Sequence, residues 1–186
     1  AAQRNLNIGI DALSFFEVGP IFKGDKPDDQ ISTISGLRLG SKVKRDWKNS
    51  SENFDFYDVK LDVFKTLEAI GVNINSLQTY QNTPSYFHPG RSAVLKIGQN
   101  LVANIGEIHP VITDFYGFEK SILAFEIFYE NIPIPKKLKV SRPMLKTSPL
   151  QPVTREFAFV IDETTPAEKL VQIAKLTNKD IIKDVL

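Results

Sequence analysis

The side chains best suited to chemistry lie in two short stretches, one around a Pro-Gly-Arg run and one around a glutamate. His88 and Arg91 belong to the first stretch, and Glu107 and His109 belong to the second. Two imidazoles and a carboxylate are a known ligand set for a metal ion, so a free-standing hydrolase or metalloenzyme using these four residues is one hypothesis. Each histidine directly precedes a proline, which favours a structural position at a turn of the chain over metal binding.

Other signatures of catalysis are missing from the sequence. There is no cysteine, no Gly-x-Ser-x-Gly elbow and no glycine-rich phosphate loop. Asp55, Asp58 and Asp62 are spaced to share one side of a helix and could suggest a divalent cation, but Lys60 and Lys65 favour a solvated surface of mixed charge. The residues therefore predict no catalytic, substrate-binding or metal-binding site.

The run Pro89-Gly90-Arg91 predicts a structural corner. Proline fixes its own φ, glycine can take a φ closed to other residues, and arginine carries a planar head with five donors. We expect Arg91 to bond a carboxylate or backbone carbonyls, with Glu107 as first choice because a hairpin folds the two stretches together. The rival hypothesis is a substrate-binding Arg91, whose unpaired head would point into an open pocket.

Hydrophobic patterning predicts the elements that position these residues. Strands with short connections favour antiparallel pairing, and the 55–70 segment repeats its apolar residues at helical spacing, with Asp55 as its N-cap. Pro20 predicts an edge position or a bulge, since it cannot donate to a ladder. The expected strands cover residues 13–22, 30–39, 92–97, 101–105 and 121–129, with a short helix from Pro110.

A stretch rich in proline and lysine follows and predicts a domain boundary near Lys146. We therefore expect one domain over residues 1–146 and part of another over 147–186. In the second, residues 156–162 alternate as a strand, Thr165 to Glu168 resembles a capping box before a helix, and 181–186 resembles a further strand. The only tryptophan, Trp47, could stack on a base, although such a residue more often plugs the edge of a core.

Composition narrows the class of protein. The formal net charge of +1 is not that of a general polyanion binder, so any contact with nucleic acid must be local. The lack of cysteine fits a reducing cytosol, and no apolar run approaches the length of a membrane span. The chain starts with Ala1 and not methionine, which suggests a fragment or a processed product.

Several motifs, taken together, resemble the beta chain of bacterial phenylalanine–tRNA ligase and suggest a C-terminal fragment of it. Their order and spacing across nearly the whole chain make the resemblance specific. The matching stretches are Phe15-Phe16-Glu17-Val18-Gly19, Phe54-Asp55-Phe56-Tyr57-Asp58-Val59-Lys60, Tyr86-Phe87-His88-Pro89-Gly90-Arg91-Ser92-Ala93, Ile105-Gly106-Glu107-Ile108-His109-Pro110 and Val153-Thr154-Arg155-Glu156-Phe157-Ala158-Phe159-Val160.

The resemblance implies an α+β fold, in which an antiparallel sheet with flanking helices of the class II synthetase type precedes the start of a ferredoxin-like anticodon-binding domain. It implies a non-catalytic, cytoplasmic piece that serves assembly with the alpha chain in an α2β2 enzyme and positions tRNA(Phe), with no membrane contact. The whole enzyme attaches phenylalanine to tRNA using ATP and magnesium, and no cofactor is expected in this piece. Arg155, at the start of the anticodon-binding part, is the one candidate for a tRNA contact.

Overall fold

The computed structural model describes residues 1–43, 45–133, 144, 150–178 and 180–185. The chain divides into two compact units, Ala1–Leu138 and Lys139–Leu186. The domain boundary expected near Lys146 falls outside the described residues, so it stays a prediction.

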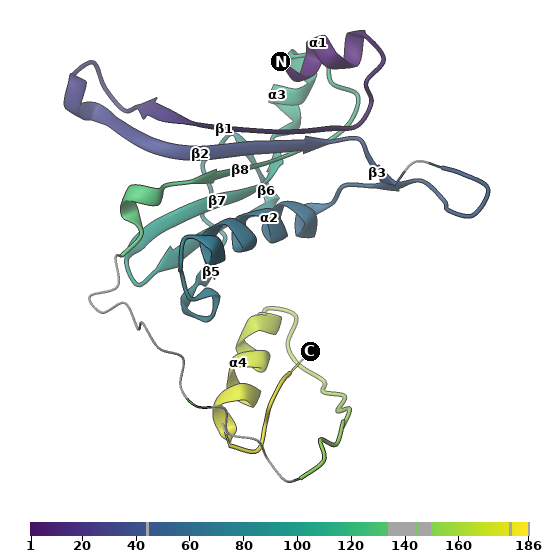
Figure 1. Ribbon diagram of the computed structural model, residues 1–186, viewed down its shortest axis with the longest axis vertical. Coiled ribbons are helices and arrows are strands. Elements are labelled where there is room, and N and C mark those ends of the chain that lie inside the picture. The colour runs from purple at the N-terminus through teal and green to yellow at the C-terminus, as the bar shows by residue number, and fades with distance from the viewer. Residues whose placement is uncertain (44, 134–143, 145–149, 179, 186) are drawn as a thin grey trace. The chain divides into compact units, whose positions relative to one another are not determined.

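The first unit is built on a six-stranded antiparallel sheet (Figure 1). Its strand order is β1-β2-β8-β7-β6-β5, and every neighbouring pair is antiparallel. The sheet therefore confirms the predicted α+β fold with an antiparallel sheet and flanking helices. The strands are β1 (Leu13–Phe22), β2 (Gln30–Leu39), β5 (Gln78–Tyr80), β6 (Phe87–Ile97), β7 (Asn100–Ile108) and β8 (Ile122–Ile127).

Strand β1 forms one edge of the sheet and pairs with β2 along its full length, from Leu13 opposite Leu39 to Phe22 opposite Gln30. The edge position predicted from Pro20 is confirmed. Proline is tolerated there because an edge strand has a side on which no ladder hydrogen bond is needed.

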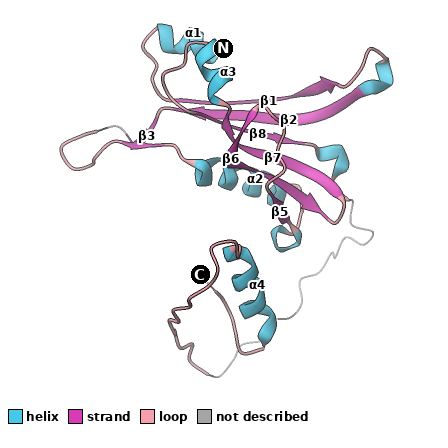
Figure 2. Ribbon diagram, turned by 180° about the vertical axis from the view of Figure 1, so that it is seen from behind, coloured by secondary structure: helices cyan, strands magenta, loops and turns pink. Residues whose placement is uncertain are grey.

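Helix α2 (Phe56–Ala69) covers one face of the sheet (Figure 2). Asp55 caps it by accepting hydrogen bonds from the backbone N–H groups of Tyr57 and Asp58, and Asp58 bonds back to the N–H of Asp55. This reciprocal pair satisfies backbone donors that every helix leaves open at its start. Val59, Val63 and Leu67 are fully buried on the sheet, so the predicted helix and its cap are confirmed.

Two short helices, α1 (Ala2–Asn7) and α3 (Pro110–Phe115), lie beside each other in Figures 1 and 2. They adjoin a second, smaller core of Ala2, Leu13, Leu39 and Ile122. This cluster closes one end of the sheet on the face that α2 leaves open. No helix among the described residues is long and apolar enough to cross a membrane.

In the second unit, the described residues hold one helix, α4 (Ala167–Thr177). The predicted strands over 156–162 and 181–186 are wrong for the described residues, because none of these is in a strand. The predicted capping box is also wrong: Pro166 occupies the N-cap position, and no side chain caps the helix. A strand needs a neighbour for its ladder hydrogen bonds, and alternation in the sequence cannot supply one.

Candidate functional site

The Pro89-Gly90-Arg91 run lies within strand β6, where the register with β7 shifts between Phe87 and Ser92. The expected corner is therefore a local irregularity inside a strand. Gly90 does not use a positive φ, so its conformational freedom is not what shapes the segment. The Gly90 N–H donates to Nδ1 of His88 at 3.1 Å, which ties the irregular part of the strand to itself.

Arg91 is held by Glu107 across the β6–β7 pair. Its Nε lies 2.7 Å from Oε2 of Glu107, and its Nη2 donates to Oε1 at 3.2 Å. Ser121 donates to the same Oε1 at 2.8 Å. The Glu107 side chain is only 11% exposed, whereas that of Arg91 is 57% exposed. The buried carboxylate is thus fully partnered, and the arginine covers it from the solvent side.

The Arg91–Glu107 pair borders an open pocket of about 440 Å³ at the N-terminal end of α2. Phe54, Phe56 and Tyr57 supply its aromatic wall. The substrate hypothesis required an unpaired guanidinium facing such a pocket. The pocket is present, but the head of Arg91 is already paired with a carboxylate. A structural role for Arg91 therefore remains the prediction.

Replacing Arg91 by alanine is expected to lower the free energy of unfolding by about 1 kcal/mol, because the pair is half open to solvent and Glu107 keeps Ser121 as a donor. Chemical denaturation of the variant beside the unmodified chain measures this. Unchanged stability together with lost ligand binding would instead indicate a functional arginine.

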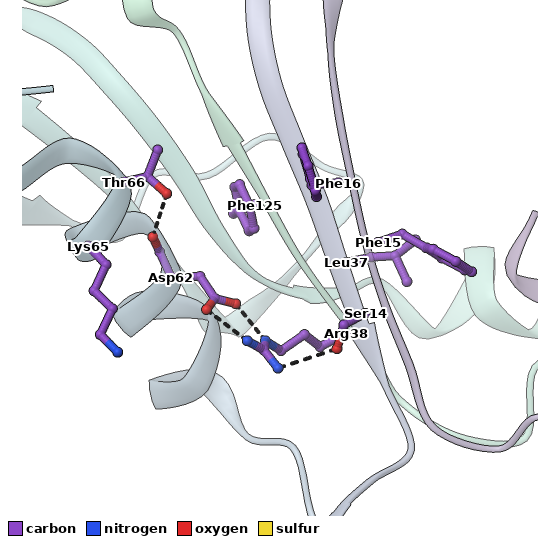
Figure 3. A pocket seen from close by; sticks show the side chains of 9 residues that line it. All are labelled: Ser14, Phe15, Phe16, Leu37, Arg38, Asp62, Lys65, Thr66 and Phe125. Carbon is purple, nitrogen blue, oxygen red and sulfur yellow. Dashed lines mark hydrogen bonds and ion pairs between the residues drawn. The ribbon is translucent and has the colours of Figure 1, made fainter. Parts of the chain in front are cut away.

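A second pocket, of about 290 Å³, lies between α2 and the β1–β2 hairpin (Figure 3). Arg38 from β2 bonds both carboxylate oxygens of Asp62 on α2, at 2.5 Å and 2.8 Å, and also donates to Ser14. The hydrogen bonds to Asp62 are the main reason why the pKa of Arg38 is raised. The apolar part of the lining consists of Phe15, Phe16, Leu37 and Phe125. This ion pair fastens the helix to the sheet near its edge.

Neither histidine is available as a metal ligand in the arrangement proposed from the sequence. Nδ1 of His88 accepts from Gly90, and Nδ1 of His109 accepts from Val111 at the start of α3. Among the described residues, no group of three or more histidine, aspartate or glutamate side chains is placed to hold a metal ion. The hydrolase or metalloenzyme hypothesis therefore finds no support.

The two pockets also fit ATP with magnesium poorly. A triphosphate needs several free cations, but Arg38 and Arg91 are each bonded to a carboxylate, which leaves Lys65 as the remaining cation in the two linings. A magnesium ion prefers an oxygen-rich site, and no carboxylate cluster occurs among the described residues. No reaction step can therefore be derived through these groups in this part of the chain.

Sequence reasoning missed a polar cluster on the sheet face opposite α2. Tyr86 donates to Oε2 of Glu126 at 2.6 Å, and the amide of Asn104 donates to the same oxygen at 3.2 Å. Asn104 is 2% exposed, and its Oδ1 has no hydrogen-bond partner among the described residues. The only signal in the sequence was Glu126 as the one charge in an apolar strand.

Burial, followed by the hydrogen bond to Glu126, raises the pKa of Tyr86. The phenol therefore keeps its proton in the folded chain at a pH where the unfolded chain, with an ordinary value near 10.0, has lost it. The stabilising contribution of this group is complete below about pH 10 and declines as the pH rises further.

Denaturant unfolding from pH 9 to 12 tests this contribution of Tyr86. The unmodified chain should lose more stability over this range than a Tyr86→Phe variant, which has no phenol to ionise at this position. If the free energy of unfolding changed with pH in the same way for the two chains, Tyr86 would titrate alike in the folded and unfolded states.

Arg155 lies in the second unit and is exposed to solvent. Its Nη1 donates to the carbonyl of the adjacent Thr154 at 3.4 Å. Its role as a tRNA contact stays a prediction.

A solved structure has a similar fold. A solved pyrrolysyl tRNA synthetase from Desulfitobacterium hafniense is similar, with a TM-score of 0.50 over 70% of this chain and 43% of that chain. Sequence identity between the two is 11%, so the likeness concerns the fold alone.

Sequence comparison identifies the family. Residues 1–129 match the family model described as phenylalanyl tRNA synthetase beta chain CLM domain. The phenylalanine–tRNA ligase beta subunit of Rhodospirillum rubrum is 37% identical over 187 residues, and that of Paramagnetospirillum magneticum is 38% identical over 186. The chain belongs to the phenylalanyl-tRNA synthetase beta chain family. It is covered completely in both comparisons and spans 23% of the length of each relative.

Proposed function

We propose that this chain is a non-catalytic part of a phenylalanine–tRNA ligase, where it serves assembly with the alpha chain and helps to position tRNA(Phe). The observation that carries the proposal is the match of the whole chain to beta subunits of that ligase. The geometry agrees, because the pocket arginines are bonded to carboxylates and both histidines to backbone N–H groups. The ligase as a whole would use ATP and magnesium in the cytoplasm, with both cofactors bound outside this piece.

The proposed assembly is an α2β2 heterotetramer, and co-purification tests it. A tagged alpha chain from a relative such as Rhodospirillum rubrum should retain this chain on an affinity column. A useful control is a variant that is destabilised in its core. Its retention on the column should fall in proportion to its unfolded fraction. Failure of the folded chain to bind the alpha chain in equilibrium sedimentation would overturn the proposal.

Catalysis is tested separately. The purified chain alone should show no phenylalanine-dependent exchange between ATP and pyrophosphate, because the arginines that line its pockets are bonded to carboxylates and no group of described side chains is placed to hold a metal ion. Measurable exchange that survives further purification would contradict a non-catalytic role.

We also propose that residues 147–186 contribute to a ferredoxin-like anticodon-binding domain, with Arg155 as a tRNA contact. The support is the coverage of this segment by the relatives, together with the amphipathic helix α4. Replacing Arg155 by alanine should weaken tRNA binding in a filter assay while leaving binding of the alpha chain unchanged. Equal tRNA affinity of the two chains would remove Arg155 from the site.

A further inference from the structure

A hairpin carries the only tryptophan of the chain away from the main sheet (Figures 1 and 2). Its base is a separate two-stranded ladder, in which Ser41 lies opposite Asn53 and strand β3 (Ser41–Val43) pairs with β4 (Glu52–Asn53). Lys42 in this base contacts Asp58 at the start of α2, with 2.8 Å between Nζ and Oδ1. Among the described residues of the hairpin, the base is thus the part that is fastened to the body of the unit.

The tip of the hairpin is a tight turn built by Asp46. One carboxylate oxygen accepts from the backbone N–H groups of Lys48 at 2.8 Å and Asn49 at 2.6 Å, and the Asp46 N–H donates to the carbonyl of Asn49 at 3.1 Å. These bonds, that from the Asn49 N–H foremost, lower the pKa of Asp46. The carboxylate is committed to the turn, and the two central residues, Trp47 and Lys48, project outward.

Trp47 is 94% exposed, so the expectation that it plugs the edge of a core is wrong. No aromatic pair or cation–π contact of this ring occurs among the described residues. A tryptophan leaves a large apolar surface in water when it is unpacked. A turn that holds such a ring outward is suited to a partner that covers it.

The charges beside the ring indicate which partner. Arg45 and Lys48 are exposed and form no ion pair with a described residue. The carboxylate of Asp46 accepts hydrogen bonds from the backbone N–H groups of Lys48 and Asn49, so its negative charge faces the backbone. A protein interface usually surrounds an aromatic anchor with other apolar groups and few charges, whereas a lone ring between cations matches a base with its flanking phosphates.

We propose that the hairpin tip Arg45–Lys48 is an RNA contact, in which Trp47 stacks on an unpaired or terminal base and Arg45 and Lys48 bind the adjacent phosphates. The inference deepens the proposed function, on which it rests, by placing a contact for RNA on the first unit. Because every base has a face on which an aromatic ring can stack, the tip would bind an RNA strand without selecting its sequence.

Intrinsic fluorescence tests the proposal directly, because Trp47 is the only tryptophan. A single-stranded RNA oligonucleotide should quench the emission of Trp47 and protect it from acrylamide. Inorganic polyphosphate, which has charge but no bases, should bind without this quenching. RNA binding detected by anisotropy of a labelled oligonucleotide, with unchanged tryptophan emission, would overturn the proposal, as would an absence of RNA binding.

Variants separate the ring from the charges. Trp47→Ala should weaken RNA binding roughly 5- to 100-fold through the lost stacking. Lys48→Gln should reduce the slope of log affinity against log salt by about 0.7 for one lost phosphate contact. Phe115→Ala, which removes an 81% exposed ring from α3, and Lys120→Gln are the matched controls and should bind RNA normally. An equal loss in the controls would contradict a local site.

Adding the alpha chain to the fluorescence assay tests the RNA contact and the proposed assembly separately. RNA quenching of Trp47 without binding of the alpha chain would support the RNA contact and refute assembly. Quenching by the alpha chain, with no response to RNA, would overturn the RNA contact and identify the tip as a protein interface.

Discussion

Replacing Gly106 by alanine is expected to lower the free energy of unfolding by roughly 2–6 kcal/mol, through overpacking and backbone strain together. A Cβ at this position in β7 would lie 2.4 Å from Cβ of Ser92 and 2.8 Å from the carbonyl oxygen of Arg91. The φ of +153° adds strain for any residue with a side chain. Small single domains are stable by only about 5–15 kcal/mol, so much of the variant should be unfolded in mild denaturant.

Gly90→Ala is the matched control for Gly106, because it lies on the partner strand β6. A Cβ there would come no closer than 3.7 Å to any neighbour, and the backbone has no positive φ. Its stability should change by less than about 1 kcal/mol. Similar denaturation midpoints for the two variants would show that the β6–β7 contact is not as tight as the structure has it.

The second large effect is expected at Leu67, where substitution by alanine should cost about 2–5 kcal/mol. Leu67 is fully buried between α2 and the sheet, and its truncation leaves a cavity in the main core. Both the lost burial and the lost packing contacts lower the stability. Calorimetric unfolding of the variant gives the size of the effect.

Leu61→Ala makes the same chemical change on the outer side of the same helix. Leu61 is 50% exposed, so its replacement should change stability by less than about 1 kcal/mol. The difference between the two variants measures what the sheet contributes to α2. Equal costs would mean that helix propensity, and not packing, determines the effect.

The elements of the first unit were predictable because local patterns coincide with tertiary structure there. The apolar spacing of α2 and its Asp55 cap are both local, and the β1–β2 hairpin is closed by a short turn. The segment from Glu156 to Asp162 was wrongly predicted to be a strand, since alternation shows only that a segment could pair. Whether it does so depends on a neighbouring strand, which the described part of the second unit lacks.

The candidate site was less predictable than the fold. The Arg91–Glu107 contact followed from opposite charges on adjoining strands, but the cluster of Tyr86, Asn104 and Glu126 joins three separate elements and has no spacing of its own. The burial of Trp47 was predicted wrongly for another reason. A tryptophan is buried or exposed according to how far its hairpin extends from the sheet, and no local pattern records that distance.

The edge strand β1 has a consequence for solubility. Phe16, Val18 and Phe22 are 79%, 61% and 68% exposed, so an aggregation-prone ribbon lies on the rim of the sheet. Pro20 interrupts its row of backbone donors, which hinders the addition of a strand from another molecule. The opposite rim, β5, is only three residues long and offers little to extend. Pro20 at one edge and the short length of β5 at the other therefore hinder open-ended polymerisation of the sheet.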